Sequence, residues 1–427
     1  MGKALSHAEN GGRQRGVGED RREANQRTGS DNIGGLPDDA RGKRPVCCYD
    51  IRNCYAQFSL PESEDGADPS LPFRTVPVST PLARMKTLRP LRLSLVAGLT
   101  SLVGVGVVGQ AQAQSVATVP VGAVTKDIPV GLVDLGVTLT NPPVLRGAVS
   151  SNTDIQLTVG GLSSVGSLLT AGEPYYVEFV SGVRESERFE VDVAATQASD
   201  DGSVTIKGSD ALNTLPSMAG LDLAGSQVVL RKHVTLTQIA SAASPSLLGN
   251  NNASLADQIW VFNTSTQQFT THFLRGDGQT WRQAGTTLTT SNMPVPPGAG
   301  LFINKTGGAA KVTFVGEVRS NDFFYKFPAG LSFHSNADPI AHSPSSFGGT
   351  GANGWSGNNN ASLADQIWTF NPVTRNFTIH FLRGDNLTWR ISGTTSDVTL
   401  SEIISHSNAF IIKRNTPDGE YIVNSRL

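Results

Sequence analysis

The segment Gly249-Asn-Asn-Asn-Ala-Ser-Leu-Ala-Asp-Gln-Ile-Trp260 returns without a single change as Gly357-Asn-Asn-Asn-Ala-Ser-Leu-Ala-Asp-Gln-Ile-Trp368, 108 positions later. Across residues 249–287 and 357–395, 29 of the 39 aligned positions are identical. Self-similarity at a fixed offset is typical of a duplicated structural unit. The sequence therefore predicts two related modules.

The modules are expected at residues 241–316 and 357–427, because the similarity continues at the same offset beyond the identical block. Phe302-Ile303-x-Lys305 aligns with Phe410-Ile411-x-Lys413. Residues 317–356 would then link the modules as one strand and a long loop rich in Pro, Gly, Ser and Asn.

Within one module the local pattern predicts short strands joined by tight turns. Ile259–Phe262 and Phe269–Leu274 are rich in residues that favour strands. Arg275-Gly-Asp-Gly278 is typical of a hairpin turn, because Gly and Asp tolerate positive φ, and Gln279–Arg282 begins the returning strand. Ser254-Leu-Ala-Asp257 has the capping-box pattern and predicts one short helical turn.

The chain before the modules begins with two unlike segments. Residues 1–84 hold all three cysteines and lack any apolar period, so they are expected to be disordered, or to lie upstream of the true start. Residues 85–113 have the order of a secretory signal peptide: a basic start, an apolar run at Leu93–Gly109 and a small-x-small cleavage site at Ala111-Gln-Ala113. The alternative is a disordered extension ahead of a membrane anchor at Leu93–Gly109.

The composition after the cleavage site narrows the class of protein. Residues 114–427 contain no cysteine, and they carry 19 Lys and Arg against 24 Asp and Glu, a formal charge of −5. This mildly acidic balance argues against a nucleic-acid partner. A second long apolar run is missing, so we expect no membrane span after signal cleavage. Oligomeric state is left open.

Residues 114–240 are expected to form an N-terminal β region that includes an insert. The motif Pro-x-Gly-Leu occurs at Pro129–Leu132 and at Pro328–Leu331. From its Gly to the Gly-Asn-Asn-Asn segment there are 118 positions in the first case and 27 in the second, so the first unit carries about 91 extra residues. Alternating apolar and polar residues predict strands in this insert, in a sheet with one solvent-facing side, at Ile155–Val159, Tyr175–Val180, Phe189–Val193, Ser203–Lys207 and Gln227–Arg231.

These patterns together predict an all-β protein. Short strands with frequent turns favour antiparallel, sandwich-like sheets, arranged as two related modules with a β-rich insert in the first.

Four segments that follow one another along the chain carry a family resemblance: Pro174–Gly182, Val229–Leu236, Ala256–Trp260 and Pro297–Ile303. As an ordered set they resemble an uncharacterised family of exported proteins of verrucomicrobial type, over most of residues 114–427. The resemblance implies secretion, and it implies no activity and no fold.

Two tryptophans beside the predicted hairpin turns are the best candidates for ligand binding. Trp281 and Trp389 occupy the same place in each repeat, and Arg282 and Arg390 next to them could bond a sugar hydroxyl. Exposed aromatic rings bind sugars by stacking. The alternative, which the residue types favour, is that both rings belong to the core.

Other motifs have structural interpretations that we favour. Arg275-Gly-Asp277 and Arg383-Gly-Asp385 match an adhesion tripeptide, but a tight turn selects the same residues. The Asn run at 250–252 lacks the carboxylate spacing of a calcium loop, so capping and turn roles are expected. His272 and His380 are expected to be hydrogen-bonded strand histidines. We predict no catalytic residues, no metal site and no cofactor.

The sequence favours an exported, non-enzymatic surface or envelope protein with a binding or scaffolding role, with an extracellular glycan or envelope component as its partner. The rival interpretation is an extracellular hydrolase acting on polysaccharide. A secreted, periplasmic or cell-surface location follows from the signal peptide.

The exported protein is predicted to begin at Gln114, because cleavage follows the small-x-small site. Mass spectrometry of secreted material should identify Gln114 at the N-terminus and no peptide from residues 1–84. Reproducible recovery of such peptides would overturn the assignment of the start.

Overall fold

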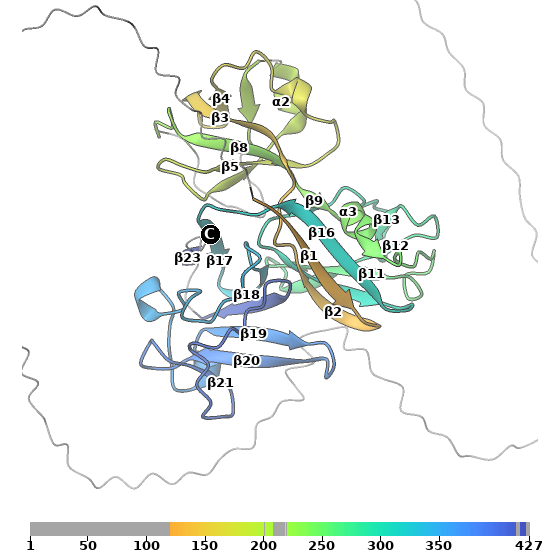
Figure 1. Cartoon of the computed structure of the whole chain (residues 1–427), viewed down its shortest axis with the longest axis vertical. Coiled ribbons are helices and arrows are strands. Elements are labelled where there is room, and N and C mark those ends of the chain that lie inside the picture. Colours follow the sequence, from red (N-terminus) through yellow and green to blue (C-terminus); the bar gives the residue numbers. More distant parts are fainter. Residues whose placement is uncertain (1–119, 200, 208–217, 219, 416–418, 424–427) are drawn as a thin grey trace, which may run out of the picture. The chain divides into compact units, whose positions relative to one another are not determined.

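The computed structural model describes residues 120–199, 201–207, 218, 220–415 and 419–423. The predictions for residues 1–84 and for the signal peptide at 85–113 lie outside this range. Every strand pair formed by the described residues is antiparallel, and short strands dominate (Figure 1). The prediction of an all-β, sandwich-like fold is confirmed.

A five-stranded sheet forms the centre of the first module. Its order is β13-β12-β11-β15-β2. The predicted strands of the repeat are present as β11 and β12, and the returning strand as β13. The bounds are β2 (Gly131–Gly136), β11 (Gln258–Asn263), β12 (Gln268–Leu274), β13 (Trp281–Gln283) and β15 (Gly300–Lys305).

The second module has a five-stranded sheet with the corresponding order, β21-β20-β19-β22-β18. Beside each sheet lies a further antiparallel pair, β1 with β16 in the first module and β17 with β23 in the second. The bounds are β1 (Val121–Ile128), β16 (Ala310–Glu317), β17 (Phe323–Phe327), β18 (Gly330–Ser335), β19 (Gln366–Asn371), β20 (Asn376–Leu382), β21 (Trp389–Ile391), β22 (Ala409–Arg414) and β23 (Gly419–Val423).

The segment 317–356 is therefore more than a linker. Its strands β17 and β18 correspond to β1 and β2 of the first module, and β18 pairs with β22 along its whole length. Gly131 and Gly330 open the corresponding strands β2 and β18 with φ of 102° and 87°, a conformation that favours glycine. The Pro-x-Gly-Leu motif thus marks the same structural position twice.

The register corrects the alignment of the repeat near its end. Ile259 in β11 lies opposite Ile303, and the corresponding Ile367 in β19 lies opposite Ile412. Sequence alignment at an offset of 108 had matched Ile303 with Ile411. The second module has one extra residue in the connection before β22, so the structural offset there is 109.

The two central sheets face each other through aromatic side chains. Phe302 of β15 stacks on Phe333 of β18 at 4.7 Å between ring centroids, and it also meets Phe370 edge-on at 5.0 Å. Two corresponding backbone hydrogen bonds also join the modules. Gly136 N donates to Ser407 O at 3.0 Å, and Ser335 N donates to Gly298 O at 2.8 Å. The modules are thus related by an approximate two-fold axis.

Each sheet buries its opposite face in a separate core. The first core contains Ile259, Ile303 and Trp281 and is covered by β1, β16 and the helix α3 (Leu236–Ser241). The second contains Ile412 and Trp389. Smaller elements are β9 (Val234–Thr235), which pairs with β14 (Pro294–Val295), β10 (Ala243–Ser244), and the 3-10 turns η1 (Gly166–Leu168), η2 (Gly351–Asn353) and η3 (Ala361–Leu363).

The insert forms a six-stranded sheet of its own, in the order β6-β5-β8-β3-β4-β7, with its own apolar core. All five predicted strands are present. The first strand, β3, was not predicted, and Val193–Ser199 form the helix α2 where the expected strand at 189–193 would have ended. The bounds are β3 (Pro143–Asn152), β4 (Gln156–Val159), β5 (Tyr175–Phe179), β6 (Arg188–Glu190), β7 (Ser203–Thr205) and β8 (Gln227–Lys232).

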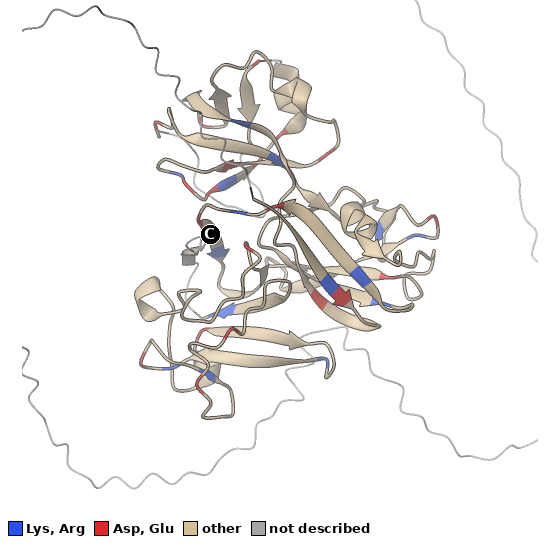
Figure 2. Ribbon diagram, in the orientation of Figure 1, with Lys and Arg blue, Asp and Glu red and all other residues tan. Residues whose placement is uncertain are grey.

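The face of the insert sheet opposite its apolar core carries charged side chains, which form ion pairs with residues outside the insert. Arg231 of β8 contacts Glu317 at the end of β16 at 2.6 Å, and Glu178 of β5 pairs with Arg319. All four residues are buried. Figure 2 shows basic and acidic residues mixed along the described strands, including the strands of the insert. Removing one partner of such a buried pair leaves an uncompensated charge, so the contacts hold the insert at a defined position.

Replacing Trp281 or Trp389 by Ala should destabilise the protein by about 3–5 kcal/mol, because each removes a fully buried indole from a core. Thermal and denaturant unfolding measure the loss. Leu288→Ala and Leu387→Ala are the matched controls, since these side chains lie nearby and are exposed. Unchanged unfolding midpoints for both tryptophan variants would contradict the two cores.

Candidate functional site

The structure places Trp281 and Trp389 where they cannot bind a ligand by stacking. Both side chains are 0% exposed. They belong to different cores, so the structure does not bring them together. The interpretation that both rings belong to the core is confirmed, and the one that makes them binding residues is not. Neighbouring residues of a strand point to opposite faces of the sheet. A Trp that points into the core therefore has outward-pointing neighbours, and a polar residue such as Arg282 suits that position. Arg282 and Arg390 are half-buried.

The Arg-Gly-Asp segments are turn structures. The Asp277 carboxylate accepts hydrogen bonds from the backbone N–H groups of Gln279 and Thr280 at 2.9 and 2.8 Å. Hydrogen bonds, led by that from the Thr280 side chain, lower the pKa of Asp277 to about 2. Asp385 makes the corresponding bonds in the second module. The preference for a turn role is confirmed.

The asparagines of the repeated block also have the expected turn and capping roles. Asn252 Oδ1 accepts from Ser254 N at 3.0 Å, and Asn360 caps η3 in the same way. The predicted short helical turn is present in the second module as η3, but its cap is Asn360, and the predicted capping box does not form because Asp257 has other partners. It is fully buried and pairs with Lys305 at 2.5 Å, as Asp365 pairs with Arg414 at 2.9 Å.

His272 and His380 are buried strand histidines, as predicted. His272 Nδ1 lies 3.1 Å from Thr290 Oγ1, and His380 Nε2 lies 3.1 Å from Thr369 Oγ1. Burial lowers the pKa of each to about 4, so both are neutral at physiological pH.

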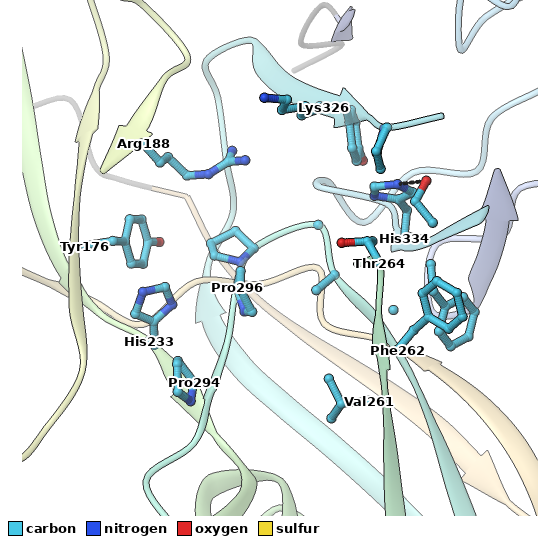
Figure 3. A pocket seen from close by; sticks show the side chains of 18 of the residues that line it. Tyr176, Arg188, His233, Val261, Phe262, Thr264, Pro294, Pro296, Lys326 and His334 are labelled. Carbon is cyan, nitrogen blue, oxygen red and sulfur yellow. Dashed lines mark hydrogen bonds between the residues drawn. The ribbon is translucent and has the colours of Figure 1, made fainter. Parts of the chain in front are cut away.

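The site that the structure does assemble is a cavity of about 440 Å³ formed by three separate parts of the chain (Figure 3). The insert contributes one wall, β11 and the segment before β15 contribute the second, and β17 and β18 contribute the third. Ligand sites are commonly found at such junctions, with volumes in this range.

The insert wall holds most of the titratable groups. Tyr176, Arg188, Glu190 and His233 line the cavity, and each is less than a tenth exposed. His233 Nε2 lies 2.8 Å from Glu190 Oε1, and the His233 and Tyr176 rings are 4.6 Å apart. These side chains share a face because Tyr176 pairs with Glu190 across β5 and β6 and alternates with residues of the insert core.

Arg188 is held by the start of the second module. Its Nη2 donates to the backbone carbonyl of Phe324 at 3.0 Å, and its guanidinium carbon lies 3.9 Å from the centre of the Phe323 ring. Figure 3 shows the side chain extending into the cavity, on the same side as Tyr176 and His233. Arg188 thus couples the insert to the second module and faces the site.

The remaining walls are largely apolar. Val261 and Phe262 come from β11, and Pro294, Pro296 and Pro297 form a stiff rim before β15. His334 of β18 is hydrogen-bonded through Nε2 to Ser332 Oγ at 2.7 Å. Burial lowers the pKa of His334 to about 3. His334 is therefore a neutral hydrogen-bonding group.

The charged groups of the lining are few. Among the described residues that line the cavity, Arg188 and Lys326 are cationic and Glu190 is the one carboxylate. Groups of three or more His, Cys, Asp or Glu side chains able to hold a metal ion do not occur within the described part of the chain.

Sequence reasoning missed this site because its members are far apart in the chain. The one local signal was the alternation of charged and apolar residues at Glu178, Arg188, Glu190 and Arg231, which we interpreted as a solvent-facing side of the insert sheet. That face is instead buried against the modules.

Comparison with known proteins found no matching protein-family model, curated protein or solved structure. The resemblance to exported proteins of verrucomicrobial type stays a prediction. In the described residues, no helix is both long enough and apolar enough to cross a membrane.

Acidification should destabilise the protein between about pH 6.5 and pH 4. The folded pKa of His272 and His380 is lowered from 6.5 to about 4, so the unfolded chain takes up protons first as the pH falls. Imidazole NMR signals assigned with His272→Gln and His380→Gln should show both rings neutral at pH 5.5, with the exposed His406 as the solvent-facing control. Titration of either ring near 6.5 would contradict the expectation.

Proposed function

We propose that this chain is an exported, non-enzymatic binding protein of the cell surface or envelope, and that the cavity at the junction of the insert and the two modules is its ligand site. The observation that carries the proposal is the cavity itself. It is built from three chain segments, and buried ion pairs around it hold those segments in place before any ligand arrives. Preformed, mostly apolar cavities with a few converging polar groups are typical of small-molecule sites.

The lining does not favour the rival proposal of a polysaccharide hydrolase. Glycosidases generally place two carboxyl groups on either side of the bond that they cleave. Glu190 is the one carboxylate among the described lining residues, and it lies against His233. A binding role requires no such pair.

The expected glycan partner rested on Trp281 and Trp389, and their burial removes that basis. Binding is now supported by the cavity, whose aromatic members include Tyr176 and Phe262. Export is supported by the order of residues 85–113 alone.

Thr264→Trp tests the site, because Thr264 lines the cavity and a larger side chain there should fill it (Figure 3). Thr266→Trp is the matched control, since Thr266 is exposed in the same turn and does not line the cavity. The purified protein is screened against a glycan array and a panel of small organic acids, amides and sugars by thermal shift.

We expect ligands that bind the unchanged protein and Thr266→Trp but not Thr264→Trp. Binding that Thr264→Trp leaves intact would place the ligand site elsewhere. If no member of the panel or the array binds, the proposed function is wrong.

A further inference from the structure

The arginine on the insert wall of the cavity is compensated within the protein, and this bears on the class of ligand if the binding role proposed above holds. Arg188 lies directly opposite Glu178 in the β5–β6 register, and Glu190 follows two positions later on the same strand. Side chains at such positions lie on the same face of a sheet. The Arg188 guanidinium also donates to the Phe324 carbonyl. Arg188 is therefore already surrounded by acceptors.

The other titratable groups of the lining have partners or carry no charge. Lys326 lies opposite Glu420 in the β17–β23 register and interacts with another part of the chain. Glu190 Oε1 lies 2.8 Å from His233 Nε2. Burial raises the pKa of Tyr176, so its hydroxyl is neutral at physiological pH. A charged ligand would lose its hydration without gaining a counter-ion from the described lining, and this loss is costly. The cavity therefore favours an uncharged ligand.

The surface that a ligand would touch is mainly apolar. Tyr176, Arg188, Glu190 and His233 are each less than a tenth exposed, so they present little of themselves to the cavity. The partly exposed or exposed lining side chains include four polar ones, Thr264, Ser265, Lys326 and His334. The apolar ones are more numerous: Val261, Phe262, Met293, Pro294, Pro296, Pro297, Ala299 and Pro328.

This lining suits a rigid ring better than a sugar or a flexible chain. A sugar has several hydroxyl groups, and each one buried without a partner costs binding free energy. The prolines fix their backbone φ and make that wall stiff, and a rigid ligand loses less conformational freedom against such a wall than an open chain does. The Phe262 ring offers an aromatic contact on the opposite strand segment.

We propose that the cavity binds an uncharged, largely apolar ring compound, which lies against Phe262 and the proline-rich segment 294–297. The volume of about 440 Å³ accommodates one such molecule. The inference rests on the proposed function, because it names the ligand class of the same site.

Three probes that share one ring body and differ in charge test the ligand class on the full chain. Calorimetry compares 2-naphthol, which is uncharged at neutral pH, with the 2-naphthoate anion and the 2-naphthylmethylammonium cation. Glucose is the polyhydroxylated probe, and 1-hexanol is the open-chain probe. We expect 2-naphthol to bind and both ions to bind roughly tenfold more weakly or worse, because each would bury a charge. Glucose and 1-hexanol should also bind at least tenfold more weakly.

Two variants assign the ring to the cavity. Phe262→Ala removes apolar contact and Thr264→Asp adds a charge beside the ring, so each should weaken 2-naphthol binding roughly tenfold. Phe377→Ala is the control for the first, because Phe377 is a partly exposed ring of β20 that does not line the cavity. Thr266→Asp is the control for the second, in the same turn. Phe262→Ala is interpreted only if its thermal melt shows folded protein, and Thr264→Asp carries the test otherwise.

The outcomes separate this inference from the proposed function. Tighter or equal binding of either ion, of glucose or of 1-hexanol, with loss in Thr264→Trp, would overturn the ligand class and leave the binding role standing. Binding of 2-naphthol that neither Thr264→Asp nor Thr264→Trp weakens would overturn both. Failure of 2-naphthol to bind at millimolar concentration would overturn the ligand class.

Discussion

A buried ion pair, present once in each module, is the interaction on which the rest of the structure depends. Asp257 has no exposed surface. Burial alone would raise its pKa, but the Lys305 ammonium and the N–H groups of Leu248 and Thr306 outweigh burial and lower it. The carboxylate thereby ties the Asn-rich turn to the end of β15. Asp365 holds Ser356, Arg414 and Asn415 in the same way. Removing one partner of a buried ion pair costs several kcal/mol of stability, about 3–5 kcal/mol. The need to keep the pair therefore fixes the register of β15 and β22.

This constraint explains why the two modules stay equivalent although their sequences diverge. The connection before β22 is one residue longer in the second module, so the residues of β22 are shifted by one position relative to the sequence alignment. Because of this shift, Arg414 and not the aligned Lys413 is the partner of Asp365. The central strands therefore present the same faces, and their aromatic side chains meet across the approximate two-fold axis. The insert breaks the symmetry, since only the first module has it. The cavity forms where that insert docks.

Several elements could be predicted because their signals are local. The β11–β12 hairpin follows from alternating apolar residues around a turn, and the strands of the insert follow from the same period. Trp281 shows the limit of this reasoning. Thr280 and Arg282 are polar, yet they do not indicate the side to which the ring between them points, because that depends on the layer that covers the sheet. The charged face of the insert sheet was predicted to face solvent, and that prediction is wrong for the same reason: the layer that covers this face comes from distant parts of the chain.

The sequence by itself determined the repeated strand order, the presence of a β-rich insert and the turn roles of Asp277 and Asp385, because each depends on residues within a few positions of one another. Only the tertiary structure decided the one-residue shift of β22 and the site. Tyr176, Arg188, Phe262 and His334 come from four different strands or strand ends, and nothing in their local sequence relates them. They meet because ion pairs between distant residues, Glu178 with Arg319 and Arg231 with Glu317, are strong only where both partners are buried together.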